Sequence, residues 1–373
     1  TLISLQGQHR RGVSHLSFSF DGKYLASIGL DEHHTIVVYD WMNQAVRCQR
    51  TSLSAKTFDL QFPPTTTDGM VQVGVNFIRF WKIQGHNMTW KSGSLGSNGQ
   101  WQTFLSVGFV GNRTVVGCQD GQLYLFAGSS LDRTVPGHTG PVNVIHSTNE
   151  GCATGGHDGL VKIYNTVLEV LTVIDVATQG SVQPNIRSVH WDNEANKVLV
   201  GTLGAEIFEL SGGDGSNMKV GGGPLVQGHS HNGEELHALS PHPFYPRYAT
   251  AGDDATLRVW DAHDHSLIYR QDLEMPSRCI AYSPKGDKLA VGYGAPIKKN
   301  AKQFDGKWEV FNSGNWTTEY TARDSQKYLT ECKWSPSGSI LVFGSFDCKI
   351  WLYDAQNDYN LLAYLTEHNA PIR

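Results

Sequence analysis

Apolar residues along the chain occur in short runs, which either alternate with polar residues or are apolar throughout. A clear set lies between residues 228 and 261, where the runs Leu236–Leu239, Tyr248–Ala251 and Leu257–Trp260 follow one another. Alternation is typical of half-buried β-strands, and short continuous runs are typical of strands buried on both faces. No segment of helical length has apolar residues at the helical period. The pattern therefore predicts an all-β protein.

The same set of three runs recurs along the whole chain. Eight units of about 47 residues can be laid out, with a fourth strand leading from each unit to the next. Their first predicted strands are Val13–Phe20, Thr57–Phe62, Thr103–Phe109, Val142–His146, Ile186–Trp191, Leu236–Leu239, Cys279–Ser283 and Thr330–Trp334. The sixth unit starts with Gly228-His229 and ends with Trp260-Asp261, as WD repeats do. We therefore expect a WD-repeat β-propeller of about eight four-stranded blade units.

Polar residues at fixed places in the sixth unit predict a buried hydrogen-bond network. His229 precedes the first strand and can reach Asp254 in the turn between the second and third strands, while Thr250 and the indole N–H of Trp260 can extend the chain of bonds. Equivalent positions are occupied in three other units, by His138, Thr154 and Asp158, by Ser27 and Asp31, and by Asp347. These residues satisfy polar groups that a packed blade would otherwise bury unpaired, so we interpret them as structural rather than catalytic.

Composition and charge narrow the possible functions. The 40 glycines and 10 tryptophans suit tight turns and narrow spaces between blades. The six scattered cysteines include no CxxC pair, which predicts buried free thiols in a reducing compartment. The formal net charge of −5 argues against general nucleic-acid binding, and no apolar run is long enough to cross a membrane.

Catalytic and metal-binding motifs are not found in the sequence. There is no GxSxG elbow, no phosphate-binding Walker loop and no HExxH pair. The histidines between residues 229 and 265 do not form a convincing set of four metal ligands, because His229 already belongs to the blade network. The sequence therefore predicts a protein that is not an enzyme and that needs no metal or cofactor.

Five segments along the degenerate blades carry a resemblance to a known family: Asp31–Trp41, Ile78–Trp81, Ala153–Gly159, Ile186–Trp191 and Gln227–His229. In their sequences and their order they resemble the echinoderm microtubule-associated protein-like (EML) family of WD-repeat proteins. The resemblance covers nearly the whole chain, although His237 stands where that family has a tryptophan, and residues 295–307 are longer than the expected turn.

The resemblance implies a scaffold that binds tubulin, microtubules or other cytoskeletal proteins, located in the cytoplasm on the cytoskeleton or in a cilium or axoneme. It also implies two joined propellers, with residues 1–226 supplying five blades of the first and residues 227–373 three blades of the second. The alternative organisation is one eight-bladed ring over residues 1–373. A ring needs only one outer strand to join its ends, and the chain offers two candidates, Leu2–Leu5 and Leu361–Leu365. The alternative function is a general WD-repeat scaffold that binds peptides and has no relation to microtubules.

A cluster of lysines in the seventh unit is the candidate partner-binding site. Lys298, Lys299, Lys302 and Lys307 fall between the predicted second and third strands, in a chain that is acidic overall. Because tubulin has an acidic surface, such a loop would favour encounter with it, and the effect would weaken as salt increases. The alternative interpretation is a solvated loop without a partner.

Overall fold

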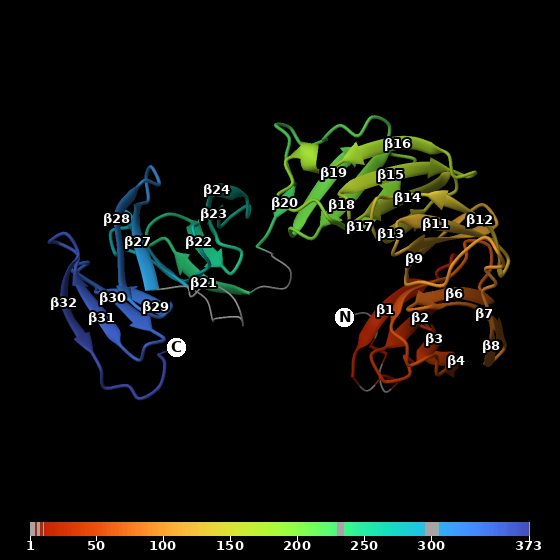
Figure 1. Cartoon of the computed structure of the whole chain (residues 1–373), viewed down its shortest axis with the longest axis horizontal. Coiled ribbons are helices and arrows are strands. Elements are labelled where there is room, and N and C mark those ends of the chain that lie inside the picture. The colour runs from red at the N-terminus through yellow and green to blue at the C-terminus, as the bar shows by residue number, and fades with distance from the viewer. Residues whose placement is uncertain (1–3, 6–7, 10, 230–234, 295–305, 373) are drawn as a thin grey trace. The chain divides into compact units, whose positions relative to one another are not determined.

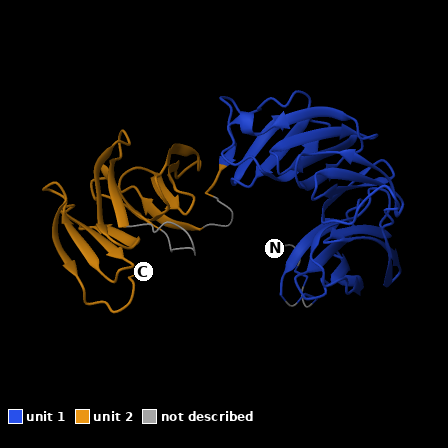
Figure 2. Cartoon of the chain, in the orientation of Figure 1, with its two compact units in different colours: residues 1–226 blue, residues 227–373 orange. Residues whose placement is uncertain are grey.

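The computed structural model describes residues 4–5, 8–9, 11–229, 235–294 and 306–372. Within these ranges the chain forms eight four-stranded antiparallel sheets, in agreement with the predicted all-β fold (Figure 1). The described residues contain a single short helix, the 3-10 turn Ala177–Gln179. By the density of contacts the chain divides into two compact units, residues 1–226 and 227–373 (Figure 2).

The first unit contains five sheets, each built from four consecutive strands. They are β1 (Val13–Phe18), β2 (Tyr24–Gly29), β3 (Ile36–Asp40) and β4 (Ala45–Arg50); β5 (Thr57–Gln61), β6 (Gly69–Gly74), β7 (Phe77–Gln84) and β8 (Asn87–Ser92); β9 (Phe104–Val110), β10 (Arg113–Cys118), β11 (Gln122–Ala127) and β12 (Ser130–Pro136); β13 (Val142–Ser147), β14 (Gly151–Gly156), β15 (Leu160–Asn165) and β16 (Val170–Asp175); β17 (Ile186–Asp192), β18 (Lys197–Thr202), β19 (Glu206–Ser211) and β20 (Val226–Gln227).

The second unit contains three sheets of the same kind. They are β21 (Leu236–Pro241), β22 (Arg247–Gly252), β23 (Thr256–Asp261) and β24 (Leu267–Asp272); β25 (Ser277–Tyr282), β26 (Lys288–Tyr293), β27 (Gly306–Asn312) and β28 (Thr318–Ser325); β29 (Leu329–Trp334), β30 (Ile340–Ser345), β31 (Ile350–Asp354) and β32 (Asn360–Leu365).

Neighbouring sheets in each unit stack face to face around their first strands. β5 packs against β1 and β9, β13 packs against β9 and β17, and β25 packs against β21 and β29. Each interface has its own apolar core; Ile28 and Val38 of the first sheet, for example, meet Leu60 and Trp81 of the second. Side chains buried between two sheets explain why the strand sequences are apolar on both faces. This radial stacking is the arrangement of propeller blades.

The main contacts between sheets follow the order of the sheets in the chain. In the first unit β1 has its main contacts with β2 and β5, and β17 has its main contacts with β18 and strands of the fourth sheet. The predicted outer strand at Leu361–Leu365 is present as β32, the fourth strand of its own sheet. The other predicted outer strand, Leu2–Leu5, lies partly outside the described residues, and Ser4 and Leu5 are not in a strand.

A β-bulge recurs at the start of the first strand in most sheets. The register against the second strand shifts between Val13 and His15, between Val142 and Val144, and between Leu236 and Ala238, among others. A bulge adds local twist and turns the following side chains. It therefore helps to set which residues of each first strand face the neighbouring sheet.

Candidate functional site

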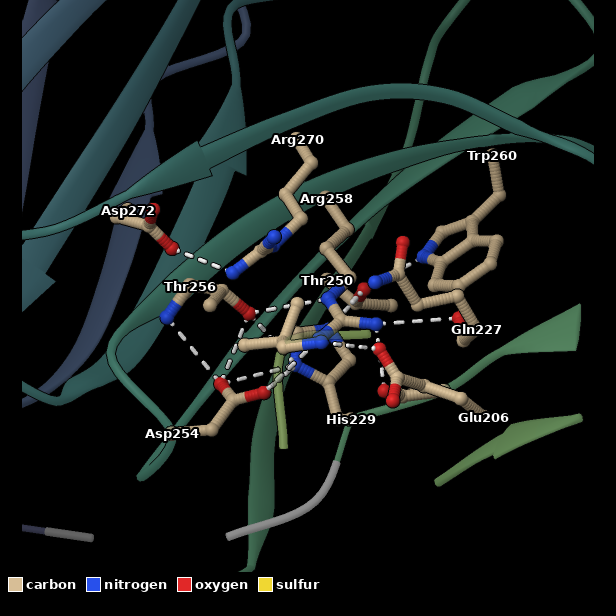
Figure 3. A network of polar contacts seen from close by, with 12 residues as sticks. Glu206, Gln227, His229, Thr250, Asp254, Thr256, Arg258, Trp260, Arg270 and Asp272 are labelled. Carbon is tan, nitrogen blue, oxygen red and sulfur yellow. Dashed lines mark hydrogen bonds and ion pairs between the residues drawn. The ribbon is translucent and has the colours of Figure 1, made fainter. Parts of the chain in front are cut away.

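The sixth sheet brings its four predicted network residues into one chain of hydrogen bonds (Figure 3). The indole N–H of Trp260 donates to the hydroxyl of Thr250 at 2.7 Å, and this hydroxyl lies 2.7 Å from Nε2 of His229. Nδ1 of His229 lies 2.9 and 3.0 Å from the carboxylate oxygens of Asp254. Because a carboxylate only accepts, Nδ1 carries the proton, and Thr250 donates to Nε2. The network joins the segment before β21 to the β22–β23 turn.

Two further residues, Thr256 and Arg258, complete this network and were not predicted from the sequence. The hydroxyl of Thr256 donates to Asp254 at 2.9 Å. Arg258 is only 3% exposed, and its guanidinium donates to the carbonyls of Gln227 and Gly228 and lies 3.4 Å from Asp254. Burial acts to raise the pKa of Asp254, but the hydrogen bonds from His229 and Thr256 and the charge of Arg258 outweigh it and lower this pKa.

The fourth sheet repeats the arrangement with its predicted residues. His138 Nδ1 lies 2.9 Å from Asp158, and Nε2 lies 2.7 Å from the hydroxyl of Thr154. Gly156 lies so close to this pair that a Cβ at its position would overlap the His138 ring and the Asp158 carboxylate. Burial lowers the pKa of His138, which keeps the ring neutral and able to accept from Thr154.

In the first sheet the structure adds His9, which the sequence analysis missed, to the predicted Ser27 and Asp31. His9 Nε2 lies 2.6 Å from the hydroxyl of Ser27. Asp31 is held by its own turn, where it accepts from the backbone N–H and the hydroxyl of Thr35 at 3.1 and 2.9 Å. The sequence did contain a feature that could have identified His9: it precedes the first strand of its unit, as His229 precedes the first strand of the sixth unit.

In the eighth sheet the predicted Asp347 has serine partners rather than a histidine. The hydroxyl of Ser325 donates to Asp347 at 3.0 Å and lies 2.8 Å from the hydroxyl of Ser345. Ser325 ends β28 and thus lies just before the first strand of the sheet, where the histidine stands in other blades. The position of the partner is preserved while its residue type has changed, so a motif search would not find it.

The fifth sheet uses a buried glutamate that was also missed. Glu206 is 1% exposed and accepts from the hydroxyl of Thr202 at 2.7 Å, from the backbone N–H of Val182 at 2.8 Å and from the hydroxyl of Ser181. It ties the segment before β17 to β18 and β19, as Asp254 ties the corresponding segments of the sixth sheet. The unit has no Trp-Asp ending, which hid this equivalence in the sequence.

The lysine cluster differs from the expectation at one position. Lys307 lies on β27 rather than in the loop, is 7% exposed, and pairs with Glu274 at 2.6 Å and Glu309 at 3.1 Å. A buried lysine with two carboxylate partners is not available to a partner protein, so the expected surface role of Lys307 is wrong. Lys298, Lys299 and Lys302 lie outside the described residues.

The described part of the chain contains no group of three or more His, Cys, Asp or Glu side chains placed to hold a metal ion. No helix within the described ranges is long and apolar enough to span a membrane. Of the six cysteines, which are all unpaired, five are buried and Cys348 is partly exposed.

A histidine on β13 gives a testable pH dependence. The His146 ring packs against the His190 ring at a tilt of 54°, with 4.1 Å between ring centroids, and its Nδ1 accepts a hydrogen bond from the backbone N–H of Trp191 at 3.2 Å. Burial, with a smaller contribution from His190, lowers the pKa of His146 to about 4. Because the folded pKa lies below the unfolded pKa of about 6.5, the unfolded chain binds a proton at His146 before the folded chain does as pH falls. The fold therefore has its full stability above about pH 6.5 and loses stability as pH falls from there toward the folded pKa.

We therefore expect acidification from about pH 7 to about pH 5 to remove about 1 kcal/mol through His146, allowing for its partial exposure to solvent. Urea unfolding at the two pH values, compared between the wild type and His146→Gln, measures this contribution. The variant cannot titrate and should lose less stability on acidification. Equal losses in the two proteins would contradict the assignment.

Comparisons with known proteins agree with the geometry. A family model described as the first β-propeller of echinoderm microtubule-associated protein matches residues 1–210, and one described as its second β-propeller matches residues 236–373. Among solved structures, the computationally designed Ika8 protein aligns with 95% of this chain and 99% of its own at 18% identity, with a TM-score of 0.47, which is too low to support an argument.

Several curated proteins are similar over nearly the whole chain. Echinoderm microtubule-associated protein-like 4 of Homo sapiens is 26% identical over 95% of this chain and 36% of its own length. Echinoderm microtubule-associated protein-like 2 of Homo sapiens is 25% identical over 93% of this chain and 51% of its own length. For echinoderm microtubule-associated protein-like 1 of Rattus norvegicus the values are 25%, 93% and 41%. The chain thus spans between about a third and a half of the length of these relatives.

Proposed function

Because the chain belongs to the echinoderm microtubule-associated protein family, we propose that it is a non-enzymatic scaffold that binds tubulin or microtubules. The observation that carries the proposal is the match of two consecutive propeller models along the chain. The relatives are microtubule-associated by name, and their similarity covers more than nine-tenths of this chain. The location that follows is the cytoskeleton, either of the cytoplasm or of an axoneme.

The proposed organisation is part of a tandem propeller pair. Residues 1–226 would supply five blades of the first propeller, and residues 227–373 would supply three blades of the second. One observation supports this assignment over a single ring: the contact-defined boundary at residues 226 and 227 falls between the two family matches. The remaining blades would then be supplied by sequence outside this chain.

The buried networks support a scaffold role because the polar groups in them are hydrogen-bonded to one another and are not free to act on a substrate. His229, Asp254 and Thr250 each have their partners within one blade. A histidine and an aspartate held in this way stabilise a turn, and the loops around them remain available for docking.

Co-sedimentation with stabilised microtubules tests the proposed function directly. We expect the purified chain to pellet with microtubules in a saturable manner and to remain in solution without them. Failure to pellet at any tubulin concentration would overturn microtubule binding by this chain. The general peptide-binding scaffold would then be the better account.

The lysine loop supplies a second arm of this experiment. We expect the combined Lys298→Glu, Lys299→Glu and Lys302→Glu variant to reduce the pelleted fraction at low salt, with the difference shrinking as salt shortens the range of the interaction. The matched control replaces three exposed lysines elsewhere with glutamate, namely Lys219, Lys285 and Lys333, and so changes the net charge by the same amount. A triple variant that pellets like this control would remove the loop from the binding site.

A further inference from the structure

A cavity of about 380 Å³ opens between the second and third sheets of the first unit. Phe80 on β7 and Phe109 on β9 contribute aromatic surface, and Pro63–Pro64, Asn112 and Ser129 belong to the turns around its mouth. These turns join first strands to second strands and third strands to fourth strands. The His–Asp networks use the other turns of the blade, so the cavity lies on the opposite rim of the sheets.

Two lysines flank the aromatic surface of this cavity. Phe80 pairs with Lys91 across β7 and β8, and Lys82 lies two residues further along β7. Side chains at paired positions, and at positions two apart, point to the same face of a sheet. That face is turned toward the third sheet, because the Phe80 ring lies 5.6 Å from the ring of Phe126. Both lysines are exposed and line the cavity.

The charges at this rim are not balanced. Within the described residues neither Lys82 nor Lys91 forms an ion pair. Asp68 adjoins the lining residue Gly69 in sequence but is paired with Arg47 at 2.6 Å, and Asp132 on β12 is paired with Arg113 at 2.7 Å. The mouth therefore carries two unpaired positive charges in a chain whose net charge is −5.

Apolar surface continues from the cavity toward the first strands. A second cavity of about 300 Å³ shares Pro64 and Phe109 with the first and is also lined by Phe18, Phe20 and Phe62. Phe18 and Phe20 are 56% and 60% exposed. The two cavities adjoin at the residues that they share, and we call them together the aromatic groove. Two adjoining apolar hollows suit successive side chains of an extended peptide better than a compact small molecule.

We propose that the aromatic groove binds an extended acidic segment of a partner protein. One or two apolar side chains of the segment would lie against Phe80 and Phe109, and flanking carboxylates would approach Lys82 and Lys91. Apolar contact would supply affinity, while the two positive charges would select acidic over basic segments and speed encounter. The groove is formed by the second and third sheets with the neighbouring first strands, so the proposal does not depend on microtubule binding.

Fluorescence anisotropy with defined peptides tests the proposal on the whole chain. The probe is a fluorescein-labelled peptide of about ten residues, with a central leucine–phenylalanine pair and two glutamates on each side. We expect saturable binding that weakens as salt increases. A peptide with lysines in place of the glutamates, and one with serines in place of the central pair, should each bind at least about tenfold more weakly. Equal binding of all three peptides would overturn the proposal.

Charge reversal then locates the site. We expect the Lys82→Glu and Lys91→Glu double variant to weaken binding of the acidic probe about tenfold. The Lys285→Glu and Lys333→Glu double variant changes net charge equally in the second unit and should leave binding unchanged; equal weakening by both pairs would contradict the assignment.

A photoreactive benzophenone in place of the central phenylalanine of the peptide should cross-link to β7 or β9, and cross-links confined to the second unit would also overturn the proposal. Microtubule co-sedimentation of the same variants is a separate readout, so the two proposals can fail independently.

Discussion

Replacing Asp254 with alanine is expected to lower the opening free energy of the sixth sheet by about 3–5 kcal/mol. The carboxylate is 5% exposed and is the shared acceptor for His229, Thr256 and Arg258. Its removal takes one carboxylate partner from the buried Arg258 guanidinium, and breaking a buried charge-assisted contact on one side costs much more than the intact contact contributes. His229 Nδ1–H loses its acceptor at the same time, which releases the segment before β21.

Native-state hydrogen exchange of the β22 and β23 amides measures this effect, because it reports the opening of one sheet within a chain of two units. Asp272→Ala is the matched control, since Asp272 lies on β24 of the same sheet and forms one surface ion pair with Arg270 while remaining 77% exposed. Its loss should stay within about 1 kcal/mol. Asp254→Asn keeps an acceptor but removes the charge and should fall between the two. If Asp254→Ala costs no more than Asp272→Ala, the network does not stabilise the sheet.

The second large effect is expected at Glu206, whose replacement by alanine should cost about 3 kcal/mol in the fifth sheet. Three donors, the hydroxyls of Ser181 and Thr202 and the backbone N–H of Val182, would lose an acceptor in a buried setting. A donor left unsatisfied in the interior loses its hydration without compensation. The segment before β17 should therefore exchange its amide hydrogens faster.

Exchange of the amides between residues 181 and 206, compared with those of the first sheet, tests this expectation. Glu209→Ala on the same strand provides the control, because Glu209 is partly exposed and pairs with Lys197 at the surface; its effect should be much smaller. Glu206→Gln retains one acceptor oxygen and should recover part of the loss. Similar exchange in Glu206→Ala and Glu209→Ala would show that Glu206 does not link the two segments.

The candidate site illustrates which residues a sequence motif can reveal. His138, Thr154 and Asp158, like the four residues of the sixth unit, stand at the spacing of a WD repeat and meet as expected from it. Glu206 and Ser325 serve the same purpose with other side chains, so no residue pattern marked them. Lys307 shows the reverse error, because its sequence neighbours suggested a loop while its side chain is buried beside Glu274 and Glu309.

By itself the sequence determined the strands, their order and the eight repeating sheets, because a strand is encoded by local alternation and by the turn residues at its ends. The family resemblance was also readable, since it rests on contiguous segments. Only the tertiary structure decided which polar side chains meet, which lysine is buried and where the aromatic groove lies. Those features depend on strand register, on the recurring bulge and on the packing of one sheet against the next, and residues far apart in the chain determine all three.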